Sequence, residues 1–235
     1  MKEVWEQIGE EVLLKTLKLS KKHKKECCFM VFIREEERKK AEKGKSFKVE
    51  ITRPALGTKE SVPEFYQIEP GVFTYKEGEG FWSPPFSIDL LAVHTHVLSE
   101  EREVPALPSL FDLYFESSRM LIAKKLSKAP FLWVPAGGVI NVWREEIVIF
   151  RTPYPLKFDK VAQKMFRHLS SSFFFNPIDY WPYYEKFIKY VGIKMCRFPI
   201  RRWKEMIPAL CDNFPFLVKI SEKNFWYLEN AQIKI

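Results

Sequence analysis

The sequence predicts an α/β (α+β) protein in which helices pack against one mainly β sheet. Three observations predict this class. Apolar residues recur at helical spacing near the start of the chain and again near its middle. The segments between them carry the continuous or alternating apolar runs that are typical of strands. With 235 residues, 46% of them hydrophobic, the chain can also bury a sizeable core without disulfides or other staples.

The first helix and strand follow from the apolar pattern of the N-terminal segment. Residues 3–22 predict one amphipathic helix, whose apolar face carries Trp5, Ile8, Val12, Leu13 and Leu17. The run from Cys27 to Ile33 is uninterrupted and apolar, which is typical of a buried strand. Residues 34–45 are almost entirely charged and end with Gly44 and Lys45, so we expect a solvated loop or a short exposed helix there.

Long connections are expected after this helix and strand. Residues 47–52 alternate like a strand that stops before Pro54. Five prolines and four glycines between residues 53 and 87 predict long connections around short strands at 64–68 and 72–75. The apolar segment 87–97 predicts the next strand, which contains two of the four histidines.

A second helix and further strands complete the first part of the chain. Residues 109–126 predict the helix. Residues 130–134 and 139–142 flank the pair Gly137-Gly138 in a hairpin-like pattern, and residues 146–150 predict another strand. The resulting order of helix, strands, helix and strands is the basis of the α/β assignment.

Positive charge is concentrated in the last third of the chain. Residues 156–235 hold 14 Lys+Arg and 7 Asp+Glu, a balance of +7, whereas residues 1–155 hold 24 and 23, a balance of +1. Two regions with different surfaces are therefore expected, 1–155 and 156–235. A basic region suggests an anionic partner such as nucleic acid.

The C-terminal region, residues 156–235, predicts a smaller, mainly helical unit. Its pattern indicates helices around 161–169, over 182–191 and from 201 onward, then a hairpin of residues 214–220 and 225–228. In one arrangement these elements form a winged-helix-like unit that presents Arg201, Arg202 and Lys204 to nucleic acid. In the other, the aromatic residues pack on the first region under a solvated basic surface.

Cysteine usage and hydropathy predict a cytoplasmic protein. The four cysteines show neither a Cys-x-x-Cys pair nor the spacing of a disulfide framework, and small buried residues are the expected role for them. The longest apolar run, Cys27 to Ile33, is far shorter than a membrane span, and the first residues lack a signal-peptide pattern. No membrane partner is expected.

Two histidines form the motif His94-Thr95-His96 on the strand expected at 87–97. Residues two apart on a strand project to the same face, so both imidazoles can reach one metal ion if the strand ends at a pocket. The alternative is a pair of partly exposed histidines at a strand end.

The second helix begins with Ser109-Leu110-Phe111-Asp112, which fits two roles. The Ser-x-x-Asp spacing is close to a capping box, in which the Ser side chain accepts from the amide of Asp112 and the carboxylate accepts from the amide of Ser109. In the other role, the first helical turn supplies Asp112 to a metal as a third ligand. Two His and one carboxylate leave a fourth position open, as in catalytic zinc sites.

These residues resemble the JAMM (JAB/MPN) metallopeptidases. The family's signature is a Glu before a buried strand, a His-x-His at a strand end, and Ser-x-x-Asp at the start of the next helix. The same order occurs as Glu26, then His94 and His96, then Ser109 and Asp112, and the resemblance covers residues 3–150. Residues 97–108 make a longer loop than the family's usual spacing, and Val97 and Phe29 replace its usual Pro and Gly.

The resemblance implies a JAB/MPN-like mixed sheet flanked by helices and a zinc-dependent isopeptidase. It implies one zinc ion per chain held by His94, His96 and Asp112, with Glu26 as the general base and Ser109 as the donor to the oxyanion. The expected substrate is the tail of a protein, of the ubiquitin-like or sulfur-carrier class. The alternative, by analogy with RadC-like members, is a nucleic-acid-associated protein in which this domain is a scaffold and residues 156–235 bind DNA or RNA.

Overall fold

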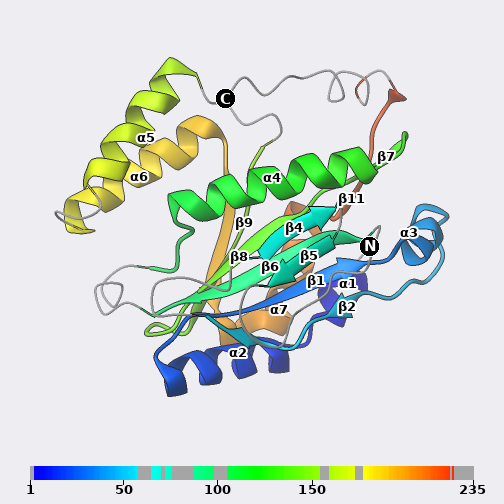
Figure 1. The fold of residues 1–235 in the computed structure, drawn as a ribbon, viewed down its shortest axis with the longest axis horizontal. Coiled ribbons are helices and arrows are strands. Elements are labelled where there is room, and N and C mark those ends of the chain that lie inside the picture. The colour runs from blue at the N-terminus through cyan, green and yellow to red at the C-terminus, as the bar shows by residue number, and fades with distance from the viewer. Residues whose placement is uncertain are drawn as a thin grey trace.

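The computed structural model describes residues 3–57, 65–69, 72–75, 87–97, 105–153, 159–172, 177–222 and 224. In these ranges the chain forms a mixed α/β fold, a mixed sheet flanked by helices (Figure 1). The helices are α1 (Glu3–Gln7), α2 (Glu10–His23), α3 (Glu35–Glu42), α4 (Leu110–Leu126), α5 (Lys160–Ser172), α6 (Pro177–Val191), the 3-10 helix η2 (Ile200–Arg202) and α7 (Trp203–Asn213). The strands are β1 (Cys27–Ile33), β2 (Glu50–Ile51), β3 (Ala55–Leu56), β4 (Phe65–Glu69), β5 (Val72–Tyr75), β6 (Ile88–His96), β7 (Phe131–Trp133), β8 (Ala136–Asn141), β9 (Glu146–Arg151), β10 (Lys194–Pro199) and β11 (Leu217–Lys219).

The main sheet has the strand order β10-β9-β8-β6-β1-β2, and β3 also pairs with β1. Strands β6 and β8 are parallel, and the other pairs of this sheet are antiparallel. Two small antiparallel pairs, β7 with β11 and β4 with β5, lie outside it. The sheet places the end of β6, where the two histidines lie, between β1 and β8.

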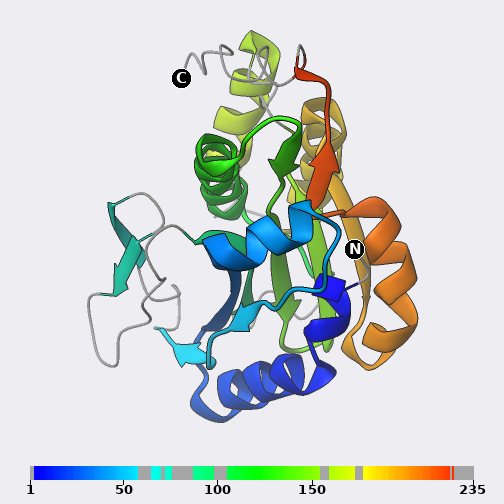
Figure 2. The same ribbon diagram turned by 90° about the vertical axis from the view of Figure 1, so that its right-hand side faces the viewer.

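Helices cover both faces of the sheet, as Figure 2 shows for α2 and α4. On one face, α1, α2 and α7 form a core with alternate side chains of β8 and β9, and Trp5, Ile140 and Trp203 are members of this cluster. On the other face, α4, α5 and α6 pack on the intervening side chains of these two strands, for which Val139 and Phe150 are examples. Alternate side chains of β8 and β9 therefore belong to two separate cores.

Several local predictions are confirmed. Strand β1 and strand β6 occupy the expected segments, and all seven residues of β1 are buried. Helix α4 and strand β9 also match, and the charged segment after β1 forms the short helix α3. None of the helices in the described part of the chain combines the length and the apolar content needed to cross a bilayer.

The single N-terminal helix expected over residues 3–22 is wrong, because Gly9 divides it. Gly9 has φ −67° and ψ 146°, an extended conformation, and it caps the start of α2. Glycine lowers helix propensity by about 1 kcal/mol relative to alanine, so interrupting the helix at this position costs less free energy than elsewhere in the segment. The break lets α1 turn away from α2, so that Trp5 of α1 packs against Trp203 of α7.

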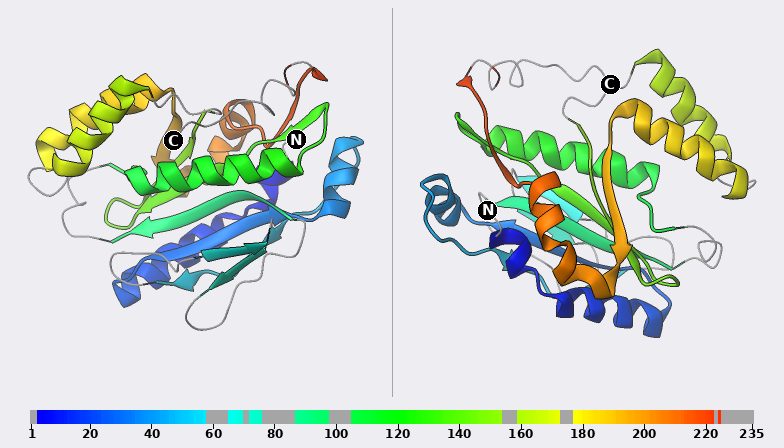
Figure 3. Two further views of the ribbon diagram at one scale, coloured as in Figure 1. Left: turned by 45° about the horizontal axis from the view of Figure 1, so that its top comes forward. Right: turned by 180° about the vertical axis from the view of Figure 1, so that it is seen from behind.

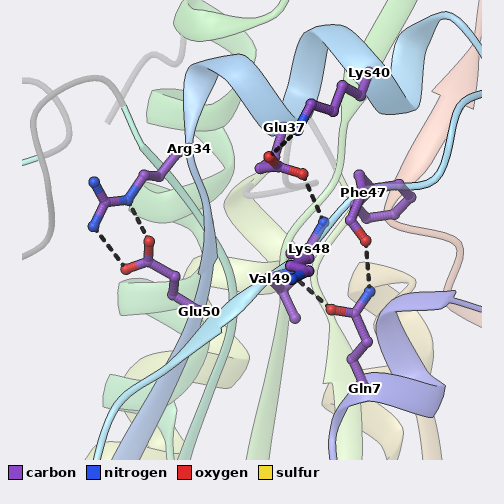
Figure 4. Close-up of polar contacts among 8 residues, drawn as sticks. All are labelled: Gln7, Arg34, Glu37, Lys40, Phe47, Lys48, Val49 and Glu50. Carbon is purple, nitrogen blue, oxygen red and sulfur yellow. Dashed lines mark hydrogen bonds and ion pairs between the residues drawn. The ribbon is translucent and has the colours of Figure 1, made fainter.

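The strand expected over residues 47–52 is reduced to the two residues of β2. In the residues that precede β2, the backbone bonds to side chains where a neighbouring strand would otherwise pair with it (Figure 4). The side chain of Gln7 donates to the carbonyl of Phe47 at 3.1 Å and accepts from the amide of Val49 at 2.9 Å, and Glu37 accepts from the amide of Lys48 at 2.8 Å. The backbone groups are satisfied without a ladder.

The hairpin expected around Gly137-Gly138 is also wrong. Both glycines lie inside β8, between β6 and β9, while β7 pairs with the distant strand β11. A Cβ atom on Gly137 would stand 2.2 Å from the ring of Phe150, its cross-strand partner, and one on Gly138 would stand 2.9 Å from the side chain of Val93. The glycines are therefore required by side-chain packing, and they do not form a turn.

The C-terminal region shares the main sheet with the first region. Strand β10 pairs with β9 along its whole length. Helix α6 and helix α7 lie over opposite faces of the sheet (Figure 3), so the winged-helix-like arrangement is wrong. Strand β11 lies within the expected 214–220 segment but pairs with β7, and its expected partner, residues 225–228, lies outside the described residues.

Candidate metal centre

Side chains at the end of β6 alternate between the two faces of the sheet. Thr95 is fully buried and faces α2, where its hydroxyl oxygen accepts from the amide of Cys27 at 2.8 Å and lies 2.7 Å from the hydroxyl of Ser20. His94 and His96, one residue to either side, face α4 on the opposite side of the sheet, where both lie close to Asp112. The strand period of two places both imidazoles on one face, as the sequence predicts.

The first turn of α4 fixes Asp112 through a capping box. The hydroxyl oxygen of Ser109 accepts from the amide of Asp112 at 3.2 Å, and Oδ2 of Asp112 accepts from the amide of Ser109 at 2.6 Å. The cap expected from the sequence is confirmed. It holds the Asp112 carboxylate in one orientation and leaves Oδ1 beside Nε2 of His94, so the same residue can serve as a cap and as a ligand.

The predicted ligand set comes together in space. Nε2 of His94 lies 3.1 Å from Nε2 of His96 and 3.1 Å from Oδ1 of Asp112, and Nε2 of His96 lies 3.6 Å from Oδ2 of Asp112. One donor atom from each residue lies within 4.8 Å of the other two. The three side chains are 13–16% exposed. In the described part of the chain, this trio could hold a metal ion.

Electrostatics keep the acidic member of the trio ionised. Burial by itself would raise the pKa of Asp112, but the charge of His94 and the hydrogen bonds from both histidines outweigh it. The pKa of this carboxyl therefore lies well below its usual range. An ionised carboxylate beside two imidazole nitrogens is a donor set that divalent cations of the first transition row accept.

Glu26 lies immediately before β1, on the strand next to the histidines. The antiparallel ladder of β1 and β6 ends with the pair Cys28 and His94, two residues beyond Glu26. Continuation of that register by two residues would place Glu26 opposite His96 and on the same side of the sheet as the trio. Its side chain is buried, at 8% exposed.

The backbone around Glu26 is held on both sides. The amide of Cys27 donates to Thr95, the hydroxyl of Ser20 donates to the carbonyl of Lys25 at 2.6 Å, and the amide of Gly57 donates to the carbonyl of Glu26 at 2.8 Å. Ser20 has a single hydroxyl proton, which it gives to Lys25, so the hydroxyl of Thr95 is the donor to Ser20. These bonds fix the backbone on both sides of Glu26.

The basic residues singled out in the C-terminal region lie away from the trio. Arg201 and Arg202 in η2 and Lys204 in α7 are exposed, and η2 and α7 pack on the sheet face that carries α2. Arg202 forms an ion pair with Glu205 at 2.8 Å. Binding of nucleic acid by these cations stays a prediction.

Sequence reasoning missed two charged residues behind the trio. Glu116 and Arg119 follow Asp112 on α4 and are 1% and 2% exposed. Their spacing from Asp112, four and seven residues, places all three on one helical face. A charged stripe on a helix face that packs on a sheet is the signal that points to them.

No protein-family model, curated protein or solved structure matches the chain.

Proposed function

We propose that the protein is a zinc-dependent hydrolase of the JAMM type, which cleaves an amide bond at the tail of a protein substrate. The convergence of His94, His96 and Asp112 on one point carries this proposal. The buried Glu26 immediately before β1 and the cap that Ser109 forms with Asp112 support it. The substrate class, a ubiquitin-like or sulfur-carrier protein, comes from the resemblance of the sequence to that family.

The donor distances fit zinc. In a tetrahedral site with bonds of about 2.0–2.2 Å, neighbouring ligand atoms stand about 3.3 Å apart. The two separations that share Nε2 of His94, 3.1 Å to Nε2 of His96 and 3.1 Å to Oδ1 of Asp112, are close to that value, and Nε2 of His96 lies 3.6 Å from the other carboxylate oxygen, Oδ2. Two imidazole nitrogens this close can share only one proton as a hydrogen bond, whereas a cation satisfies both as acceptors. Two His and one carboxylate leave a fourth position for solvent or substrate.

The roles of the surrounding side chains follow from their chemistry. A zinc ion bound by the trio lowers the pKa of a coordinated water and polarises a carbonyl. Glu26 accepts a proton as water adds to the carbonyl carbon, and it delivers that proton to the amine as the C–N bond breaks. Ser109 caps α4 with an oxygen lone pair, so its hydroxyl proton is available to the oxyanion that develops on the carbonyl oxygen.

The test of the proposal is the variant Glu26→Gln. The substitution keeps the size of the side chain and removes its ability to accept a proton, so zinc binding is expected to stay at the wild-type stoichiometry. Hydrolysis of a ubiquitin-like protein joined through its C-terminus to a fluorescent amide is expected to fall by about 10²–10⁴-fold. Wild-type hydrolysis should stop when the zinc is chelated.

The matched control is Glu50→Gln, in the same sheet. Glu50 lies on the edge strand β2 and forms a surface ion pair with Arg34. Its substitution should leave hydrolysis unchanged. Full activity of Glu26→Gln would remove Glu26 from the mechanism. Hydrolysis by wild-type protein that survives complete removal of metal would contradict the proposed function as a whole.

A further inference from the structure

An ion pair is buried between α4 and the sheet. Glu116 and Arg119 lie one and two helical turns beyond Asp112 and are almost completely inaccessible. The carboxylate of Glu116 accepts from Nη1 of Arg119 at 2.6 Å. Neither residue belongs to the trio, and the proposed chemistry uses neither of them.

The guanidinium of Arg119 joins three elements of the fold. Nη1 donates to the carbonyl of Ala136 at 3.0 Å, and Nη2 donates to the carbonyl of Asp89 at 3.0 Å. Asp89 lies in β6, the strand that ends in the two histidines, and Ala136 begins the parallel strand β8. One planar side chain therefore sets the position of α4 relative to the strand that carries the other two ligands.

Stability alone does not account for this pair. Oε1 of Glu116 and Nε of Arg119 are buried and have no hydrogen-bond partner within the described residues. Removing two charges from water costs several kcal/mol per ion, and apolar replacement of such pairs is often neutral or stabilising. What apolar side chains do not supply is a pair of directed bonds to two chosen carbonyl groups.

We propose that Arg119, oriented by Glu116, is a positioning residue that sets the separation between Asp112 on α4 and the histidines on β6. The inference rests on the proposed function, because it assigns the pair to the geometry of that metal centre. Loss of the pair would let α4 shift on the sheet by a fraction of an ångström or more. Outer-shell partners of metal ligands typically contribute 10–100-fold to metal affinity.

A second buried arginine, which contacts α4 from another helix, provides the matched control. Nη1 of Arg38, in α3, donates to the carbonyl of Leu126 at 2.8 Å, at the other end of the same helix. Leu126 is 14 residues from Asp112, about 21 Å along a helix. Arg38 is 7% exposed, so Arg38→Met also removes a buried guanidinium from a carbonyl group of α4, but far from the trio.

The experiment compares three proteins: the wild type, the control Arg38→Met, and a double variant that carries both Glu116→Leu and Arg119→Met. Unfolding in urea reports stability, and competition calorimetry with a chelator of known affinity reports the dissociation constant for zinc. For the double variant we expect cooperative unfolding and a dissociation constant 10–100-fold higher than wild type. For Arg38→Met we expect the wild-type constant within about twofold.

The inference is overturned if the folded double variant binds zinc like the wild type. If the double variant does not fold, Arg119→Lys decides, because a single ammonium cannot serve both carbonyl groups as the guanidinium does. Wild-type affinity in Arg119→Lys would then overturn the inference, and weakened affinity would support it. If the wild-type protein binds no zinc, the proposed function fails. Crystal structures of the metal-free wild type and double variant still test the positioning role. A longer Asp112–His94 distance in the variant would support the inference, and an unchanged distance would overturn it.

Discussion

Polar side chains on the two faces of strand β6 have opposite surroundings. Thr95 lies in a closed chain of hydrogen bonds from the amide of Cys27 through Thr95 and Ser20 to the carbonyl of Lys25, and Thr95 is fully buried. His94 and His96 lie in a second cluster, where two imidazole nitrogens and a carboxylate oxygen of Asp112 converge. Satisfied donors and acceptors stabilise a fold, whereas converging acceptors call for a cation.

The same contrast holds for the elements that cover the two faces. On the α2 face, Trp5 and Trp203 pack with ring centroids 6.0 Å apart, and their indole N–H groups donate to the carbonyl groups of Phe214 and Ile8. These contacts join the two ends of the described chain. The α4 face carries the trio and the buried pair behind it. We therefore expect substitutions on the α2 face to change stability and those on the α4 face to change metal binding.

The largest expected effect on stability is that of Trp203→Ala. Trp203 is 1% exposed, and truncation of a buried tryptophan removes its packing and leaves a cavity. The free energy of unfolding in urea should fall by about 3–5 kcal/mol. Trp143→Ala is the matched control, because Trp143 is 39% exposed, and it should cost about 1 kcal/mol or less. Equal losses in the two variants would contradict the placement of Trp203 in the core on the α2 face.

The second effect is expected on metal binding, for Asp112→Asn. The amide oxygen of asparagine can still accept from the backbone of Ser109, so the cap is retained, but the negative charge between the histidines is lost. The dissociation constant for zinc should rise by about 100-fold or more, beyond the range of outer-shell substitutions. Calorimetry with the metal-free variant measures it. An unchanged constant would show that Asp112 is a cap and not a ligand.

The smallest effect separates the two faces of β6 most sharply. Thr95→Val keeps the shape of the side chain and leaves the amide of Cys27 without its acceptor. We expect a loss of about 1–3 kcal/mol in the free energy of unfolding. Zinc stoichiometry should not change, because the substituted side chain points away from the trio. Loss of zinc in a folded Thr95→Val variant would mean that the two faces are not independent.

Local patterns in the sequence predicted the three residues of the candidate metal centre. The spacing of His94 and His96 on a strand and the Ser109–Asp112 cap each depend on a few neighbouring residues, and both are confirmed. That strand β6 and helix α4 meet at these residues follows from packing across the sheet. The resemblance to a known family supplied the expectation that they meet, and in the structure the three side chains do lie together.

Sequence patterns could not predict the contacts between segments that are far apart in the chain. Strand β7 pairs with β11 because of their positions in the folded chain, and nothing near residues 131–133 indicates it. Gly137 resembles a turn residue until the ring of Phe150 is placed over it. Arg119 contacts carbonyl groups of two other elements. Because every residue has a backbone carbonyl group, the sequence does not indicate which ones a side chain contacts.

The most direct test of the central claim is the zinc content of tag-free protein, measured by mass spectrometry after supplementation with zinc and gel filtration. The account predicts one zinc ion per chain in the wild type and in Thr95→Val, and none in the double variant His94→Ala with His96→Ala. A wild-type protein that emerges free of zinc, or a double variant that keeps it, would contradict the assignment of the trio as a metal centre.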